Sequence, residues 1–161
     1  MSNPVVEEVE RHDVSSAVAV AGHPVHAMLV TFPIAFTVGT LGADVLYWWW
    51  GDAFWARAAL WSSGIAFILG VIAGLVGTAE LVLVKGIRKR AASWTHAIAA
   101  MMLIAIIGAN WGLRISDHEA AVLPTGLFLS GLGMAFVGIA GWHGGKLVFE
   151  HQIGLMLSEN D

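Results

Sequence analysis

Four long apolar segments divide the chain, covering residues 27–50, 58–79, 96–113 and 120–141. Each is close to or longer than the ~20 residues that a helix needs to cross the hydrocarbon layer of a bilayer. Only Asp44 places a charge inside the first segment. The connecting segments are short, so consecutive helices are expected to run antiparallel. The pattern predicts an all-α fold: an integral membrane four-helix up-down bundle whose first and third helices lie diagonally.

The composition agrees with a membrane protein and narrows the chemistry. Apolar residues make up 57% of the 161 residues and charged residues 12%, with a mean hydropathy of +0.73. The net charge of -4 leaves no basic face for a nucleic acid, so we expect no nucleic-acid partner. Because the chain has no cysteine, any metal or haem must be held by histidine, methionine or carboxylate.

The domain organisation and the orientation follow from the polar residues. We expect a flexible acidic tail over residues 1–22, a transmembrane domain over 23–155 and a short C-terminal tail over 156–161. Lys and Arg mark the cytoplasmic side of a membrane protein. The side that carries both termini holds Arg11, Lys85, Arg88, Lys89, Arg90 and Lys146, and the other side holds Arg57 and Arg114. This excess predicts that both termini are cytoplasmic, with the chain in a cytoplasmic (inner) membrane.

Ionisable residues gather at the cytoplasmic ends of the predicted helices. His23 and His26 open the first helix, Glu80 ends the second, His96 opens the third and His151 follows the fourth. Ionisable groups at membrane depth are costly and are candidates for function. We therefore expect a shared polar layer at this end of the bundle.

Two further features have structural interpretations. Asp44 lies toward the outer end of the first helix, where we expect a structural ion pair with Arg57 or Arg114. Gly70 and Gly74 have the small-xxx-small spacing that brings membrane helices close together. The same glycines could instead make room for a flat cofactor.

Three segments of the chain resemble the bacterial membrane family known as domain of unknown function 2231. The resemblance covers about residues 23–155 and depends on three strings of the sequence. They are His23-Pro24-Val25-His26-Ala27-Met28-Leu29-Val30-Thr31-Phe32-Pro33-Ile34, Thr95-His96-Ala97, and Gly141-Trp142-His143-Gly144-Gly145-Lys146-Leu147-Val148 with Glu150, His151 and Gly154.

The resemblance implies that His23, His26, His96 and His151 are the recurrent polar positions of that family, together with an acidic residue matched by Glu80. Many relatives carry a further histidine where this chain has Thr31, which weakens any site that needs a ligand one turn deeper. Some relatives are joined to a Rieske-type iron–sulfur domain, which favours electron transfer by association.

Three functions remain open from the sequence, and no catalytic residue is identified. The first is a small b-type haem redox protein with His26 and His96 as the iron ligands, facing a membrane or iron–sulfur redox partner. The second is a divalent metal or proton site built from His23, His26, His96, Glu80 and His151. The third is an accessory subunit of a homo-oligomer or a larger membrane complex, without chemistry of its own.

The orientation is testable with reporter fusions. A reporter enzyme that is active only in the cytoplasm should work when fused after Lys89 or after Asp161, and should fail after Asp117, because the basic residues lie on the side of both termini. Activity would be measured in whole cells at matched expression. A C-terminal fusion that works only with a periplasmic reporter would reverse the predicted orientation.

Overall fold

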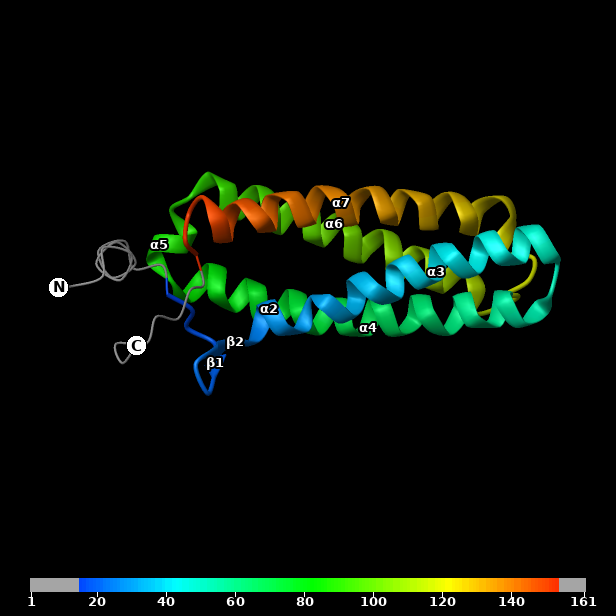
Figure 1. The fold of residues 1–161 in the computed structure, drawn as a ribbon, viewed down its shortest axis with the longest axis horizontal. Helices are drawn as coiled ribbons and strands as arrows, with labels where there is room; N and C mark the ends of the chain where they lie inside the picture. Colours follow the sequence, from blue (N-terminus) through cyan, green and yellow to red (C-terminus); the bar gives the residue numbers. More distant parts are fainter. Residues whose placement is uncertain (1–14, 154–161) are drawn as a thin grey trace.

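The computed structural model of the chain describes residues 15–153, and four long helices run side by side along its length (Figure 1). They are α3 (Thr31–Trp50), α4 (Ala53–Leu83), α6 (Ala91–Arg114) and α7 (Leu127–Phe149). Short elements precede three of them: α2 (Val25–Leu29), α5 (Lys85–Arg88) and the kinked turn η1 (Val122–Gly126). Among the described residues, four spans are long and apolar enough to cross a membrane: Val25–Trp50, Ala53–Leu83, Ala91–Arg114 and Val122–Phe149. The predicted helical membrane fold is confirmed.

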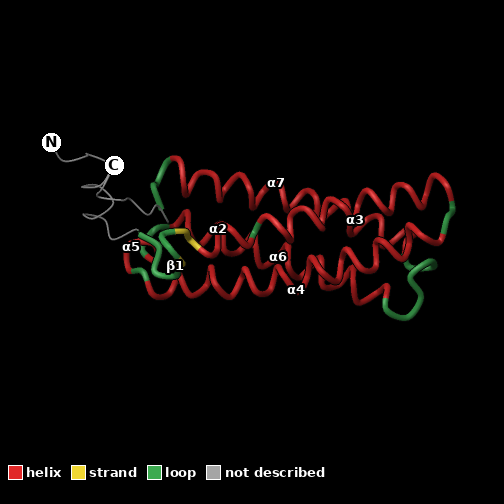
Figure 2. The backbone as a smooth tube through the Cα atoms, turned by 60° about the horizontal axis from the view of Figure 1, so that its bottom comes forward, coloured by secondary structure: helices red, strands yellow, loops and turns green. Residues whose placement is uncertain are grey.

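The helices form a closed ring in chain order. α3 packs against α4, α4 against α6, α6 against α7, and α7 returns to α3, while α3 and α6 face each other across the diagonal (Figure 2). The α3–α4 and α6–α7 connections lie at one end of the bundle, and β1 and α5 lie at the other (Figure 1). We call these the connection end and the α5 end. The predicted up-down topology and the diagonal placement of the first and third helices are both confirmed.

Small residues fill the interior and large ones face outward. Ala56, Ala59 and Ala66 are fully buried, whereas Trp49 and Phe149 are among the most exposed side chains. This arrangement suits a bilayer, because lipid solvates large apolar side chains and small ones let helix backbones approach. A central apolar cluster crosses the bundle; it consists of Ala66, Leu103 and Ile107 with Phe36, Phe67, Phe136 and Val137 packed around them.

An N-terminal hairpin lies at the α5 end of the bundle (Figure 1). β1 (Ala19–Val20) pairs antiparallel with β2 (His23–Pro24) through a two-residue turn in which Ala21 and Gly22 both have positive φ. Such a turn favours glycine, since residues with a Cβ rarely adopt positive φ. Residues 15–22, placed in the acidic tail by the sequence, are thus part of the described structure. Residues 1–14 of that tail and the C-terminal tail at 156–161 lie outside the described residues.

Gly70 and Gly74 face α6, as the packing interpretation of their spacing predicts. A Cβ on Gly70 would lie 3.5 Å from Cγ1 of Ile104, and a Cβ on Gly74 would lie 3.0 Å from its Cδ1. We expect Gly70→Leu to separate α4 from α6 and to destabilise the bundle by about 2 kcal/mol. The measurement is the midpoint of thermal unfolding in detergent.

The matched control is Leu75→Ala, because Leu75 lies on the same helix and is 67% exposed. This control should unfold at the wild-type temperature. Equal midpoints for Gly70→Leu and wild type would show that α4 and α6 tolerate separation at this level.

Candidate functional site

His26 and His96 meet at the α5 end of the bundle. His26 lies in the first turn of α2, which Pro24 caps, and His96 lies in the second turn of α6, so both enter the membrane domain from the same end. Their ring centroids are 6.3 Å apart and the ring planes are nearly perpendicular, at 84°. The structure therefore brings together the two residues that the sequence selected for a common depth.

Each ring is held by a backbone carbonyl of the membrane span that follows its own. Nδ1 of His26 lies 2.9 Å from the carbonyl oxygen of Ala73, and Nδ1 of His96 lies 3.0 Å from that of Ala140. A carbonyl oxygen only accepts, so Nδ1 of each ring carries a proton and donates it. In the neutral tautomer this leaves the lone pair on Nε2, the usual arrangement for a metal-binding histidine.

A glycine lies beneath each ring, one helical turn after each accepting carbonyl. A Cβ on Gly77 would lie 2.7 Å from Cε1 of His26, and a Cβ on Gly144 would lie 3.1 Å from Cε1 of His96. Both glycines are therefore needed for the rings to reach their carbonyls. These two positions were not predicted from the sequence, although the string Ile-Ala-Gly-x-x-Gly occurs at residues 72–77 and again at 139–144.

The other predicted site residues are engaged elsewhere. His23 is exposed, with Nδ1 2.8 Å from the carbonyl oxygen of Ala21, and Nδ1 of His151 lies 3.4 Å from Nη1 of Arg90. Over residues 15–153, no group of three or more His, Cys, Asp or Glu side chains is placed to hold one metal ion. Of the five alternative ligands, the structure brings His26 and His96 together and leaves the other three with separate partners.

Glu80 holds the N-terminal hairpin. Its carboxylate accepts hydrogen bonds from the Ser16 hydroxyl and from the backbone N–H groups of Ala17 and Val18, each N–H at 3.0 Å. The side chain is largely buried. Backbone donors thus satisfy this carboxylate and tie the segment before β1 to the end of α4.

A second polar cluster lies toward the connection end. Asp44 of α3 and Arg114 of α6 form a fully buried bidentate ion pair, with Nη1–Oδ1 and Nη2–Oδ2 distances of 2.8 and 2.7 Å. Oδ1 of Asn110 accepts from the same guanidinium, and the Ser130 hydroxyl donates to Asp44. The expected structural ion pair is confirmed with Arg114 as the partner, while Arg57 is exposed.

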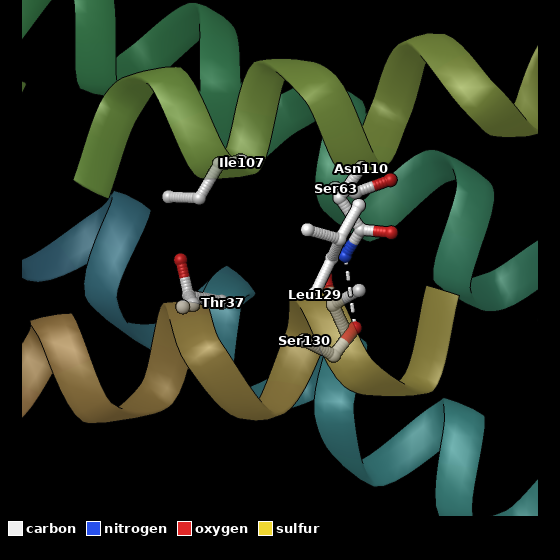
Figure 3. A pocket seen from close by; sticks show the side chains of 8 residues that line it. Thr37, Ser63, Ile107, Asn110, Leu129 and Ser130 are labelled. Carbon is white, nitrogen blue, oxygen red and sulfur yellow. Dashed lines mark hydrogen bonds between the residues drawn. The ribbon is translucent and has the colours of Figure 1, made fainter. Parts of the chain in front are cut away.

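A small cavity borders this cluster (Figure 3). Its volume is about 10 Å³, close to the room that one water molecule needs. It is lined by Thr37, Thr40, Ser63, Ile107, Asn110, Leu129, Ser130 and Gly133. The hydroxyls of Thr37, Thr40 and Ser63 donate to carbonyls of their own helices. Their remaining lone pairs add polar atoms to a lining that also includes the apolar side chains of Ile107 and Leu129.

Comparison with known families agrees with this architecture. A family model described as predicted membrane protein, DUF2231, matches residues 22–156. The chain belongs to this family. No curated protein and no solved structure matches the chain. Membership confirms the resemblance seen in the sequence and a membrane location for this DUF2231 protein, and its chemistry is inferred from the geometry above.

The buried ion pair of this DUF2231 protein should be essential for folding. Asp44→Ala leaves the Arg114 guanidinium buried without its counter-charge, which costs about 4 kcal/mol when one partner of a buried pair is removed. We expect a large loss of folded protein, measured by monodispersity in size-exclusion chromatography and by unfolding temperature.

The control is Asp117→Ala in the exposed loop after α6, where the carboxylate accepts only from local backbone N–H groups. That variant should behave nearly as wild type. If Asp44→Ala were equally well folded, water or lipid headgroups would have to reach Arg114.

Proposed function

We propose that this chain is a b-type haem protein that carries electrons in the membrane, with His26 and His96 as the two ligands of one iron. The observation that carries the proposal is the paired histidine geometry: two rings with centroids 6.3 Å apart, each oriented by a backbone carbonyl on a neighbouring helix. Four-helix bundles commonly build cofactor sites in this way.

The ring separation supports a metal between the histidines. An imidazole nitrogen lies about 2.0 Å from a bound transition metal and about 1.1 Å from the centre of its own ring, so rings on opposite sides of one ion have centres roughly 6 Å apart. The observed separation of 6.3 Å is compatible with this value, and it also lies in the range of an ordinary edge-to-face contact between two rings. Orientation by Nδ1–H donation to a carbonyl adds support, because such hydrogen bonds fix the tautomer and direction of metal-binding imidazoles.

The small number of protein ligands favours haem over a bare ion. A structural zinc site takes four ligands, whereas only two histidines meet at this place among residues 15–153. A haem would bring its own nitrogen ligands and would need only His26 and His96 from the protein. The divalent metal site with His23, Glu80 and His151 as added ligands would require those side chains to leave their present partners.

The proposed electron-carrying role rests on the two histidines. If His26 and His96 both held a haem iron, the chemistry that the haem would supply is electron transfer. The bacterial inner membrane and a membrane or iron–sulfur redox partner are parts of this proposal. Their support comes from the charge distribution of the helix ends and from the family association with iron–sulfur domains.

An accessory role in a larger complex is the second candidate. The outward face of α7 carries Gly131, Gly138 and Gly141, and a Cβ built on any of them would meet nothing within 4 Å. Small residues on an open face suit close contact with another membrane helix. This role and a haem site are compatible in one protein.

The test is purification of the full chain in detergent with haem supply during expression. Wild type should be red, with a visible absorption band that sharpens on reduction, and His26→Ala and His96→Ala should each abolish the band. The double variant should lose no more than either single variant, because both residues serve one site. His118→Ala at the connection end is the matched control and should keep full haem content.

Other results would decide against the proposal. A colourless wild type with a stoichiometric bound metal would favour the divalent site, and a colourless, metal-free wild type would favour the accessory role. A His26→Ala variant with full haem content would overturn the ligand assignment.

A further inference from the structure

The two halves of the chain carry several identical residues at matching positions. His26-Ala27 of α2 and His96-Ala97 of α6 are separated by a certain number of residues in the sequence. Ile34-Ala35 and Ile104-Ala105 are separated by the same number, so both pairs match under one shift of the numbering. We call this the first shift. A second, slightly shorter shift places the α4 string Ile72–Gly77 on the α7 string Ile139–Gly144, in which Ile, Ala and both Gly agree. Repeats of this kind point to two structural units in one chain.

The contacts repeat along with the residues. In the first half, His26 donates to Ala73 at 2.9 Å and lies over Gly77; in the second half, His96 donates to Ala140 at 3.0 Å and lies over Gly144. The helix packing repeats as well, since α3 pairs with α4 as α6 pairs with α7. The contacts between the two halves are α4 with α6 and α7 with α3. A two-fold rotation about an axis along the bundle would superpose one of these contacts on the other.

The connection end obeys the same rule. The first shift, which places His26 on His96, also places Asp44 on Arg114, so the two partners of the buried ion pair are equivalent positions. A residue that contacts its own equivalent must lie beside the symmetry axis. His26 with His96 and Asp44 with Arg114 therefore place the axis through both polar sites.

The cavity near the ion pair lies on the same axis. Thr40 and Asn110 are equivalent under the first shift, and Ser63 and Ser130 are equivalent under the second. All of these residues line the cavity, and Thr37 and Ile107 do so as a further matched pair (Figure 3). The cavity therefore receives the same positions from both halves.

We infer that the bundle consists of two equivalent helical hairpins, related by a two-fold axis along its length, and that the histidine site is made of two identical half-sites on this axis. Resting on the proposed function, this narrows the ligand to a metal centre that offers the same face to both rings. A haem would have that property, with His26 and His96 holding it in the same way. A centre that needs one imidazole and one carboxylate does not.

One departure from symmetry has a physical cause in the charges. Ser130 donates to Asp44, whereas Ser63 donates to the carbonyl oxygens of Ala59 and Leu60. Under the symmetry, Ser63 would face Arg114 as Ser130 faces Asp44. The guanidinium of Arg114 accepts no hydrogen bond, so the Ser63 hydroxyl cannot donate to it. Opposite charges at equivalent positions also disfavour the pairing of two identical hairpins, because like charges would then meet. Gly74 and Gly141 also differ, because a Cβ would lie 3.0 Å from Cδ1 of Ile104 at Gly74 and would meet nothing within 4 Å at Gly141.

A charge exchange tests the axis in the full chain. Asp44→Arg and Arg114→Asp alone each put like charges together inside the bundle and should lower the unfolding temperature by about 10 °C or more. In the double variant Asp44→Arg/Arg114→Asp, the acid and the base exchange positions across the axis. If the two positions are equivalent, the distance between the charged groups stays the same, so the double variant should recover at least half of the lost unfolding temperature. A second exchanged variant adds Thr40→Asn and Asn110→Thr, so that the amide that accepts from the guanidinium also moves to the equivalent position.

If both exchanged variants unfold at the temperature of the single variants, the two positions are not equivalent and the inferred axis is wrong. An ion pair in a site without symmetry fails this exchange, because the long arginine and the short aspartate start from unequal distances.

Gly77→Ala and Gly144→Ala test the half-sites. Each should lower the unfolding temperature, by amounts that agree within about twofold, and should reduce haem content to a similar extent. Gly112→Ala is the control, since a Cβ there meets nothing within 4 Å. A loss confined to one of the two glycines would overturn the symmetric site. A wild type without haem would refute the proposed function alone, because the unfolding temperatures would still report on the axis and on the half-sites.

Discussion

The close approach of helices through small residues is the constraint on which the rest of this structure depends. Alanine and glycine occupy the inner faces, so backbones lie near enough for side chains of one helix to reach carbonyls of the next. His26 and His96 use this proximity, because each ring lies over a glycine and donates to a carbonyl of the adjacent helix. A larger residue at either glycine would remove the ring from its acceptor.

Two separate polar layers of the interior are satisfied by hydrogen bonds, whereas the buried hydroxyl of Ser93 has no hydrogen-bond partner among the described residues. The histidine pair lies at the α5 end, the Asp44–Arg114 pair lies toward the connection end, and an apolar cluster around Leu103 separates them. In a bilayer core, each layer has to complete its own hydrogen bonds, since no water is present to do so. The ion pair achieves this with Asn110 and Ser130, which leaves the interior without net charge there.

Glu80 shows how a plausible ligand finds another role. Its carboxylate lies at the expected end of α4, but it accepts hydrogen bonds from two backbone N–H groups of the segment before β1. The sequence could not reveal this, because backbone donors are present at every residue except proline and leave no signature. The same reason hid the carbonyls of Ala73 and Ala140, which orient the two histidines.

By itself, the sequence determined the four membrane spans, their up-down order, the common depth of His26 and His96, and the need of Asp44 for a cation. These properties depend on the hydrophobicity along the chain and on helix length, because the thickness and the low polarity of the bilayer select for both. The tertiary structure alone decided that Arg114 pairs with Asp44 and that Gly77 lies beneath His26. Such choices depend on the rotation of each helix about its own axis, which only the packing of all four helices sets.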